Sequence, residues 1–213
     1  MYYDAWLPRS FVATLCRDDK LFWYNICLIV KKDFFMENFL ELLKNRRSSR
    51  VFTGEPVSEE NVCTLMKAAL MSPSGHRINP WEFILVEDKE MLKSLSVCKE
   101  HGSGLLEGAA MAVVVIADTE KTDVWIEDCS IATIIIQLAA EELGLGSCWV
   151  QVRNRKDANG VLSVDNVKSL LDIPANYAVL SIVGIGHKAR ATQPFDEEKM
   201  QWEKIHIGNF GGK

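Results

Sequence analysis

The chain has 213 residues, of which 48% are hydrophobic and 25% are charged, and its formal net charge is −5 at pH 7. This length and composition are typical of one globular domain with a substantial core. The acidic balance argues against nucleic acid as a partner, because proteins that bind it favour a basic face. The six cysteines form no CxxC pair and fit neither a disulfide framework nor a metal site, so we expect free thiols in a reducing cytoplasm.

The first 35 residues differ in character from the rest of the chain. Residues 21–30 are an apolar run, which is too short for a membrane-spanning helix of about 20 residues. The segment also lacks the basic start and small-residue cleavage site of a signal peptide, so we expect no membrane partner. An amphipathic helical pattern begins at Met36. We therefore hypothesise that Met36 is the natural start and that residues 1–35 are an N-terminal extension; a membrane-associating or dimer-wrapping segment is the alternative.

The remaining pattern alternates between helices and strands. Residues 45–52 alternate charged with apolar or small side chains, which indicates an extended segment. A helix then begins after Ser58, a suitable N-cap, and runs to residue 70. The pattern predicts strands at residues 81–86, 109–117, 148–152 and 177–185, and helices at residues 89–97, 123–143 and 164–171. Gly144 ends the longest helix as its C′ residue. Helices that interleave with a few central strands indicate an α+β or α/β class.

A loop rich in turn residues separates the helix ending near residue 70 from the strand starting near residue 81. It contains Pro73-Ser74-Gly75 and continues to Asn79-Pro80-Trp81. Exposed backbone N–H groups, an amide and an arginine would suit a planar polar ligand, and such loops often carry function. The alternative is a plain helix stop and turn, with proline and glycine as punctuation.

Three arginines fall within five residues, at Arg46, Arg47 and Arg50. In an extended segment Arg46 and Arg50 point to the same side, with Ser48 between them. Two guanidinium groups and a hydroxyl suit a terminal phosphate. The alternative is a solvated basic run on the surface.

Two glycine-containing segments, at residues 144–149 and 183–187, superficially resemble dinucleotide-binding loops. A Rossmann loop follows a strand and opens a helix, whereas residues 144–149 follow a helix, so we reject that interpretation. No Ser-His-Asp order, HExxH motif or Walker loop is visible in the sequence. The difficult chemistry then belongs to a cofactor, while the protein supplies position and electrostatics.

Four segments in order, RRSSR at 46–50, PSGHRINPWEF at 73–83, GLGSCW at 144–149 and VGIGH at 183–187, resemble the nitroreductase family of FMN-dependent oxidoreductases. The resemblance spans residues 36–210. It implies an α+β fold with a central mixed or antiparallel sheet flanked by helices, and a flavin domain at residues 36–213. It also implies a domain-swapped homodimer, in which the aromatic C-terminal tail often wraps the partner subunit.

The resemblance further implies how the phosphate of FMN is held. The family's RR-S-x-R segment binds the phosphate and ribityl chain, and the matching residues here are Arg46, Arg47, Ser48 and Arg50. Relatives also supply a late basic residue to the phosphate. Lys188 and Arg190 are the candidates, and we select Arg190.

The flavin ring would be contacted by two further segments. In the family the partner subunit lends a PSG loop to the flavin, and the matching residues here are Pro73, Ser74 and Gly75. Asn79 matches an amide that meets the isoalloxazine edge, while Arg77 stands where many relatives have asparagine. The GLGSCW segment runs along the ring in relatives, which implies contacts from Cys148, Trp149 and Val150, largely by their backbone.

The implied reaction is a ping-pong cycle that needs no catalytic side chain and no metal. NADH or NADPH would deliver hydride to flavin N5, and a small electron acceptor such as a nitroaromatic or a quinone would then be reduced. One alternative is a relative specialised for reductive dehalogenation or flavin fragmentation. Another is a flavin-sequestering or redox-sensing protein without turnover.

Overall fold

The computed structural model describes residues 34–212, so the hypothesis about residues 1–35 lies almost wholly outside the described part. Two compact units divide the chain, and the larger comprises residues 42–195. The described residues of the smaller unit are 34–41 and 196–212. Helix α3, Phe34–Asn45, begins in the smaller unit, and two short 3-10 turns, η3 and η4, lie at Glu197–Lys199 and Trp202–Lys204. The candidate site belongs to the larger unit.

A four-stranded sheet forms the centre of the larger unit. In chain order its strands are β1 (Trp81–Val86), β2 (Met111–Asp118), β3 (Leu145–Gln151) and β4 (Tyr177–His187). In space their order is β1-β2-β4-β3, and every neighbouring pair is antiparallel. The predicted α+β class is confirmed, and the sheet takes the antiparallel form. Strand β3 lies at an edge, which leaves one of its sides open for other partners.

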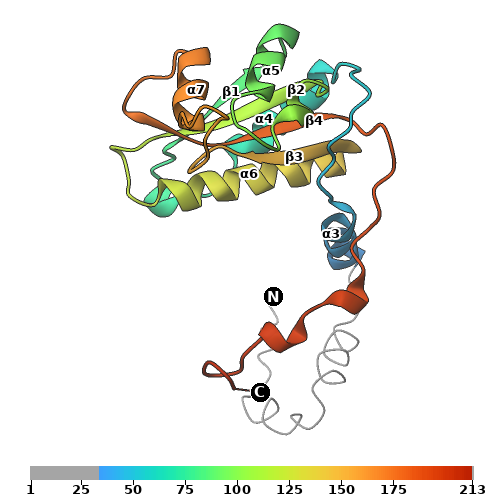
Figure 1. The fold of residues 1–213 in the computed structure, drawn as a ribbon. Coiled ribbons are helices and arrows are strands. Elements are labelled where there is room, and N and C mark those ends of the chain that lie inside the picture. Colours follow the sequence, from blue (N-terminus) through green and yellow to red (C-terminus); the bar gives the residue numbers. More distant parts are fainter. Residues whose placement is uncertain (1–33, 213) are drawn as a thin grey trace, which may run out of the picture. The chain divides into compact units, whose positions relative to one another are not determined.

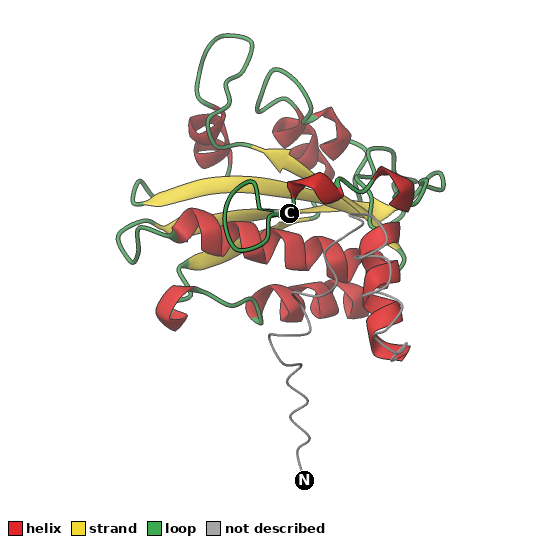
Figure 2. Cartoon of the chain, turned by 90° about the horizontal axis from the view of Figure 1, so that it is seen from below, coloured by secondary structure: helices red, strands yellow, loops and turns green. Residues whose placement is uncertain are grey.

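Helices cover both faces of this sheet (Figure 1). The helices on one face are α4 (Glu59–Leu70) and α6 (Trp125–Glu142), and those on the other are α5 (Lys89–Ser96) and α7 (Ser163–Leu170). In the view from below, the strands lie between helices on their two faces (Figure 2). Strand β2 is buried along nearly its whole length, as a continuous apolar run predicts for a strand covered on both faces. None of the helices described is long and apolar enough to cross a membrane.

Local sequence signals set the ends of these helices. Ser58 caps α4, since its side chain accepts a hydrogen bond from the amide of Asn61, and Gly144 follows α6 with a φ of +72°. Both predictions are confirmed. Strand β3 begins at Leu145, three residues before the predicted start, because Leu145 pairs with His187 of β4.

Candidate functional site

The arginine-rich segment, residues 46–52, lies against the start of β3 and the end of β4. The amide of Ser49 donates a hydrogen bond of 2.9 Å to the carbonyl of Ser147 in β3. Further on, the amide of Ala189 donates to the carbonyl of Val51 over 3.2 Å. This close approach needs a glycine in β3, because a Cβ on Gly146 would lie 2.7 Å from the Cβ of Ser49. The segment is therefore fixed at one corner of the sheet.

Arg46, Ser48 and Arg50 all act electrostatically on the thiol of Cys148. Burial raises the pKa of this thiol, while Arg50, a hydrogen bond with Ser48, and the charges of Lys99 and Arg46 act in the opposite direction. This shared influence agrees with the alternation of an extended chain, which places the three residues on one side of the segment. Among the described residues, neither Arg46 nor Arg50 has an acidic partner. These cations are available to an anion.

Arg47 lies apart from this group. Its guanidinium is 5.9 Å from the centre of the Phe195 ring, a cation–π distance. Ser49, two residues further along the chain, is buried. Three of the four predicted residues of this segment therefore act on the Cys148 thiol, whereas Arg47 lies at a cation–π distance from Phe195.

The two late basic candidates have different surroundings. Lys188 pairs with Glu141 of α6, with 2.7 Å between the nitrogen and the oxygen. Arg190 is exposed and has no acidic partner in the described part of the chain. Val51 and Ala189 are hydrogen-bonded, and the two segments run antiparallel. Arg50 and Arg190 are therefore the next two residues that face each other. The backbone therefore brings Arg190 close to Arg46 and Arg50, which we call the arginine cluster.

The outer edge of β3 presents backbone groups beyond this corner. The carbonyl of Ser147 points outward, since Ser49 donates to it, so alternate residues Trp149 and Gln151 also direct their N–H and C=O groups outward. The indole of Trp149 donates to the side chain of Gln151 over 2.9 Å, which fixes both side chains. Val150 instead pairs inward with Ile182 and has a fully buried side chain.

The loop after α4 is held by its own hydrogen bonds. The hydroxyl of Ser74 donates to Oδ1 of Asn79 over 2.7 Å and accepts from the Asn79 amide over 2.9 Å. A 3-10 turn, η1 (Gly75–Arg77), follows Pro73 and Ser74, and His76, Arg77 and Asn79 have positive φ angles. The side chains of Arg77 and Asn79 are exposed. The loop thus has a defined conformation, and it exposes the side chains of Arg77 and Asn79 to solvent.

A buried acid in the first turn of α6 anchors this loop. Oδ1 of Asp128 accepts a hydrogen bond of 2.9 Å from the amide of Gly75. Our sequence reasoning missed Asp128, because its partner lies 53 positions earlier in the chain. A signal was present nevertheless, since an acid next to Cys129 on an otherwise apolar helical face is unusual.

The loop and the arginine cluster lie at opposite ends of α6. Asp128 holds the loop at the first turn, whereas Glu141 holds Lys188, close to the cluster, at the last turn. At 1.5 Å per helical residue these two acids are about 20 Å apart along the axis. One chain therefore does not gather the two predicted groups into one compact site.

The corner of the sheet fits a planar ligand that carries a phosphate. Guanidinium groups without an acidic partner among the described residues suit the phosphate. Outward backbone groups on the edge of β3 suit a ring with hydrogen-bonding atoms along its rim. Within the part of the chain described, no group of three or more metal-ligating side chains forms a metal site.

Comparisons with known proteins identify the family of the chain. The model of the nitroreductase family matches residues 43–101 and 94–187. A protein of Archaeoglobus fulgidus, provisionally named NADH dehydrogenase/NAD(P)H nitroreductase, is 36% identical over 176 residues, which are 80% of this chain and 98% of that protein. The FMN reductase (NADPH) of Bacillus subtilis is 26% identical, over 72% of this chain and 67% of its own length. Among solved structures, the FMN-dependent nitroreductase of Clostridium difficile R20291 is 43% identical with a TM-score of 0.78, covering 80% of this chain and 99% of that one.

Proposed function

Because the chain belongs to the nitroreductase family, we propose that it is an FMN-dependent oxidoreductase that uses NAD(P)H to reduce small electron-poor molecules. The observation that carries the proposal is that Arg46 and Arg50 have no acidic partner among the described residues and that their segment lies at the edge strand β3. A cation cluster without an acidic partner is costly unless an anion occupies it. A ligand with one terminal phosphate and a planar ring satisfies both features.

Arg46, Ser48 and Arg50 would hold the phosphate, and Arg190 would approach it from the end of β4. Two guanidinium forks and a hydroxyl give charge-assisted hydrogen bonds to the phosphate oxygens. Arg47, which lies over Phe195, would contribute to the local positive charge rather than through a direct contact. Lys188 is already neutralised by Glu141, which favours Arg190 as the late basic residue.

The edge of β3 would hold the ring. Trp149 offers outward N–H and C=O groups, and a planar ring with donors and acceptors on its rim binds such an edge as an added strand would. Cys148 would lie between ring and phosphate, since the charges of Arg46 and Arg50 act on its thiol. Val150 would support this edge from within the core rather than through its own backbone groups.

A second copy of the chain would complete the site. The loop of residues 73–79 lies about 20 Å along α6 from the arginine cluster, so in a homodimer this loop can serve the flavin of the partner. Helix α6 also exposes Ile131 and Ile134, and α4 ends in the exposed pair Leu70 and Met71. Exposed apolar side chains on neighbouring helices are typical of an interface between subunits.

When bound, FMN would accept hydride from NAD(P)H and pass the electrons to the acceptor in a ping-pong cycle. The chain's own residues would bind and orient the cofactor, and Asn79 of the partner loop would donate to the ring edge. A nitroaromatic or a quinone is the acceptor class that we propose. The four described cysteines are all free thiols, which suits a cytoplasmic location.

The test begins with the purified protein. We expect a yellow protein that releases a flavin with one phosphate on denaturation and is bleached by anaerobic NAD(P)H. A nitroaromatic or quinone should then restore the oxidised spectrum. Release of FAD, or no flavin after reconstitution, would refute the cofactor assignment. Bleaching without reoxidation by any acceptor would favour a redox sensor without turnover.

A further inference from the structure

Asp128 is a buried acid with only one of its oxygens engaged. The residue is 3% exposed, and its Oδ1 accepts the amide of Gly75 over 2.9 Å. Its Oδ2 is buried and has no hydrogen-bond partner among the described residues. Burial of such an oxygen is unfavourable, and a native protein usually retains it for a reason other than stability.

The surroundings of Asp128 are closely packed and poorly solvated. Burial, together with the nearby Asp128 charge, raises the pKa of the Cys129 thiol to about 12. A Cβ on Gly75 would approach Val124 of the preceding turn to 3.1 Å, so the loop and the helix are already in close contact. An apolar residue at position 128 would fill this space without an unpaired oxygen.

The loop that Asp128 holds has an unusual backbone. His76, Arg77 and Asn79 all have φ angles between 50° and 59°, and left-handed conformations of such residues persist only where the surroundings determine them. In the described part of the chain, the bond from Gly75 to Asp128 is the only hydrogen bond that joins residues 73–79 to another element. This bond therefore fixes where the loop stands relative to α6.

The inner bonds of the loop fix which group it presents. Ser74 occupies both Oδ1 and the backbone amide of Asn79, so the remaining Nδ2 group of Asn79 is left as a hydrogen-bond donor. Asn79 is exposed. A donor in a fixed orientation can recognise an acceptor on the edge of a planar ring.

We propose that Asp128 is a positioning residue, whose buried carboxylate holds the loop of residues 73–79 in the conformation that presents Asn79 to the flavin. Asp128 acts through Gly75 and does not touch the cofactor. This inference rests on the proposed function, because the loop is useful only if it meets a flavin.

The experiment compares Asp128→Leu with Asp128→Asn, with Glu127→Gln as the control for loss of an exposed acid on the same helical turn. FMN affinity is measured by fluorescence titration of the apoprotein, apoprotein stability by thermal unfolding, and loop mobility by hydrogen exchange of residues 73–79. We expect Asp128→Leu to weaken FMN binding at least about tenfold, with faster exchange in the loop but no lower melting temperature. Asp128→Asn keeps an acceptor oxygen and should stay within about threefold of the wild-type affinity.

The outcomes separate this inference from its alternatives. An FMN affinity of Asp128→Leu within about twofold of wild type would overturn it. If Asp128→Asn loses as much FMN affinity as Asp128→Leu, the inference is also overturned, because an acceptor oxygen at position 128 would then make no difference. A lower melting temperature in Asp128→Leu with unchanged exchange in the loop would show a general structural role instead. If Asp128→Leu fails to fold, Asp128→Ala, whose vacated space admits water, carries the same comparison. Failure of the wild-type apoprotein to bind FMN would refute the proposed function itself.

Discussion

Lys188 and Glu141 form an ion pair, 2.7 Å long, that joins the end of β4 to the last turn of α6. The two side chains are only 19% and 10% exposed, so solvent screens the pair weakly. Lys188 follows the strand that packs against the arginine-rich segment, and Phe52 of that segment bridges to it. The pair therefore supports the corner of the sheet where we place the phosphate.

Replacing Lys188 with Met should destabilise the protein. Glu141 would be left mostly buried without a partner, and an unpaired buried group of this kind costs about 1–3 kcal/mol. Urea unfolding of the apoprotein measures the loss. The double variant Lys188→Met with Glu141→Leu should recover most of it, because neither charge is then left alone. Equal stability of wild type and Lys188→Met would show that the pair contributes nothing.

Replacing Arg50 with Ala should weaken FMN binding by about 1.5–3 kcal/mol, the usual contribution of a hydrogen bond to a charged group. This corresponds to roughly ten- to a hundredfold in the dissociation constant. The loss should be smaller for riboflavin, which lacks the phosphate, and FMN binding should become less sensitive to salt. Fluorescence titration of the apoprotein checks both ligands.

Lys93→Ala is the matched control for Arg50, since it removes one exposed positive charge from α5. It should leave FMN affinity unchanged. Equal losses for FMN and riboflavin in Arg50→Ala would contradict a phosphate contact. An unchanged affinity would make Arg50 a solvated surface charge.

Replacing Arg190 with Ala should weaken FMN binding in the same range, about 1.5–3 kcal/mol, without a loss of stability. The reason is that Arg190 has no acidic partner in the described part of the chain, so nothing within the fold is left unpaired. The measurement combines FMN titration with urea unfolding of the apoprotein. If stability falls while affinity is retained, Arg190 is a structural residue and the late phosphate contact lies elsewhere.

Mixed dimers should reveal whether the loop serves the partner's flavin. One subunit carries Arg50→Ala, and the other carries Asn79→Gly, which removes the amide at a φ of 50° that glycine accepts. If loops cross between subunits, one site of the mixed dimer has both defects and the other has neither. We then expect one flavin per dimer at wild-type affinity, measured on dimers purified through two different tags. If each loop serves its own chain, both sites are defective and no high-affinity flavin is found.

The sequence predicted the elements of this fold well because their signals are local. Alternation predicts Arg46, Ser48 and Arg50 on one side, and all three act on the pKa of the same thiol. The continuous apolar run predicted β2 as a buried strand, and it is one. These signals need only the period of the backbone and the position of apolar side chains.

Contacts between distant parts of the chain could not be read in the same way. Lys188 and Arg190 look equivalent in sequence, and only the fold shows that Glu141, 47 positions before Lys188, neutralises the first of them. Arg47 belongs to the same motif as Arg46, yet its guanidinium lies over the ring of Phe195. Such pairings depend on which elements pack together, and a single sequence does not contain that information directly.

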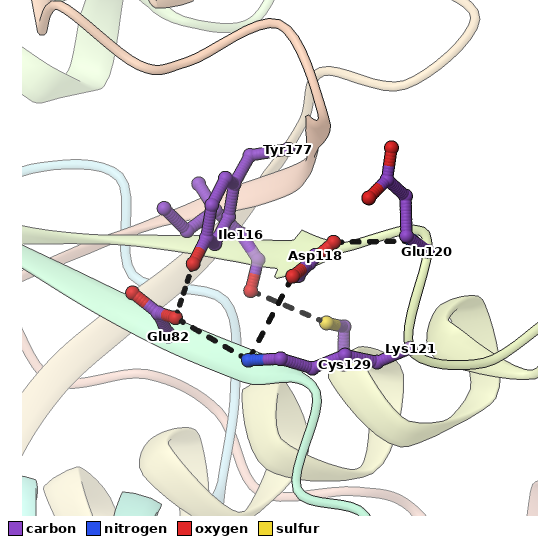
Figure 3. Close-up of polar contacts among 7 residues, drawn as sticks. All are labelled: Glu82, Ile116, Asp118, Glu120, Lys121, Cys129 and Tyr177. Carbon is purple, nitrogen blue, oxygen red and sulfur yellow. Dashed lines mark hydrogen bonds and ion pairs between the residues drawn. The ribbon is translucent and has the colours of Figure 1, made fainter.

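Tyr177 donates a hydrogen bond of 2.5 Å to Glu82, and Lys121 lies 3.9 Å from the same carboxylate oxygen (Figure 3). The pKa of Tyr177 is raised to about 12, mainly by this hydrogen bond. Desolvation and the charges of Glu82 and Asp118 contribute less. A pKa above the unfolded value of about 10 means that the protonated phenol is favoured by folding, so its stabilisation is complete below pH 10 and is lost as the pH rises toward 12.

The free energy of unfolding should therefore differ between wild type and Tyr177→Phe by a constant amount from pH 7 to 9, and this difference should shrink above pH 10. Chemical unfolding across this range measures it, and spectrophotometric titration of wild type against Tyr177→Phe reports the ionisation of the phenol directly. A difference that stays constant up to pH 12, or a phenol that titrates near pH 10 in the folded protein, would contradict a hydrogen bond to the carboxylate.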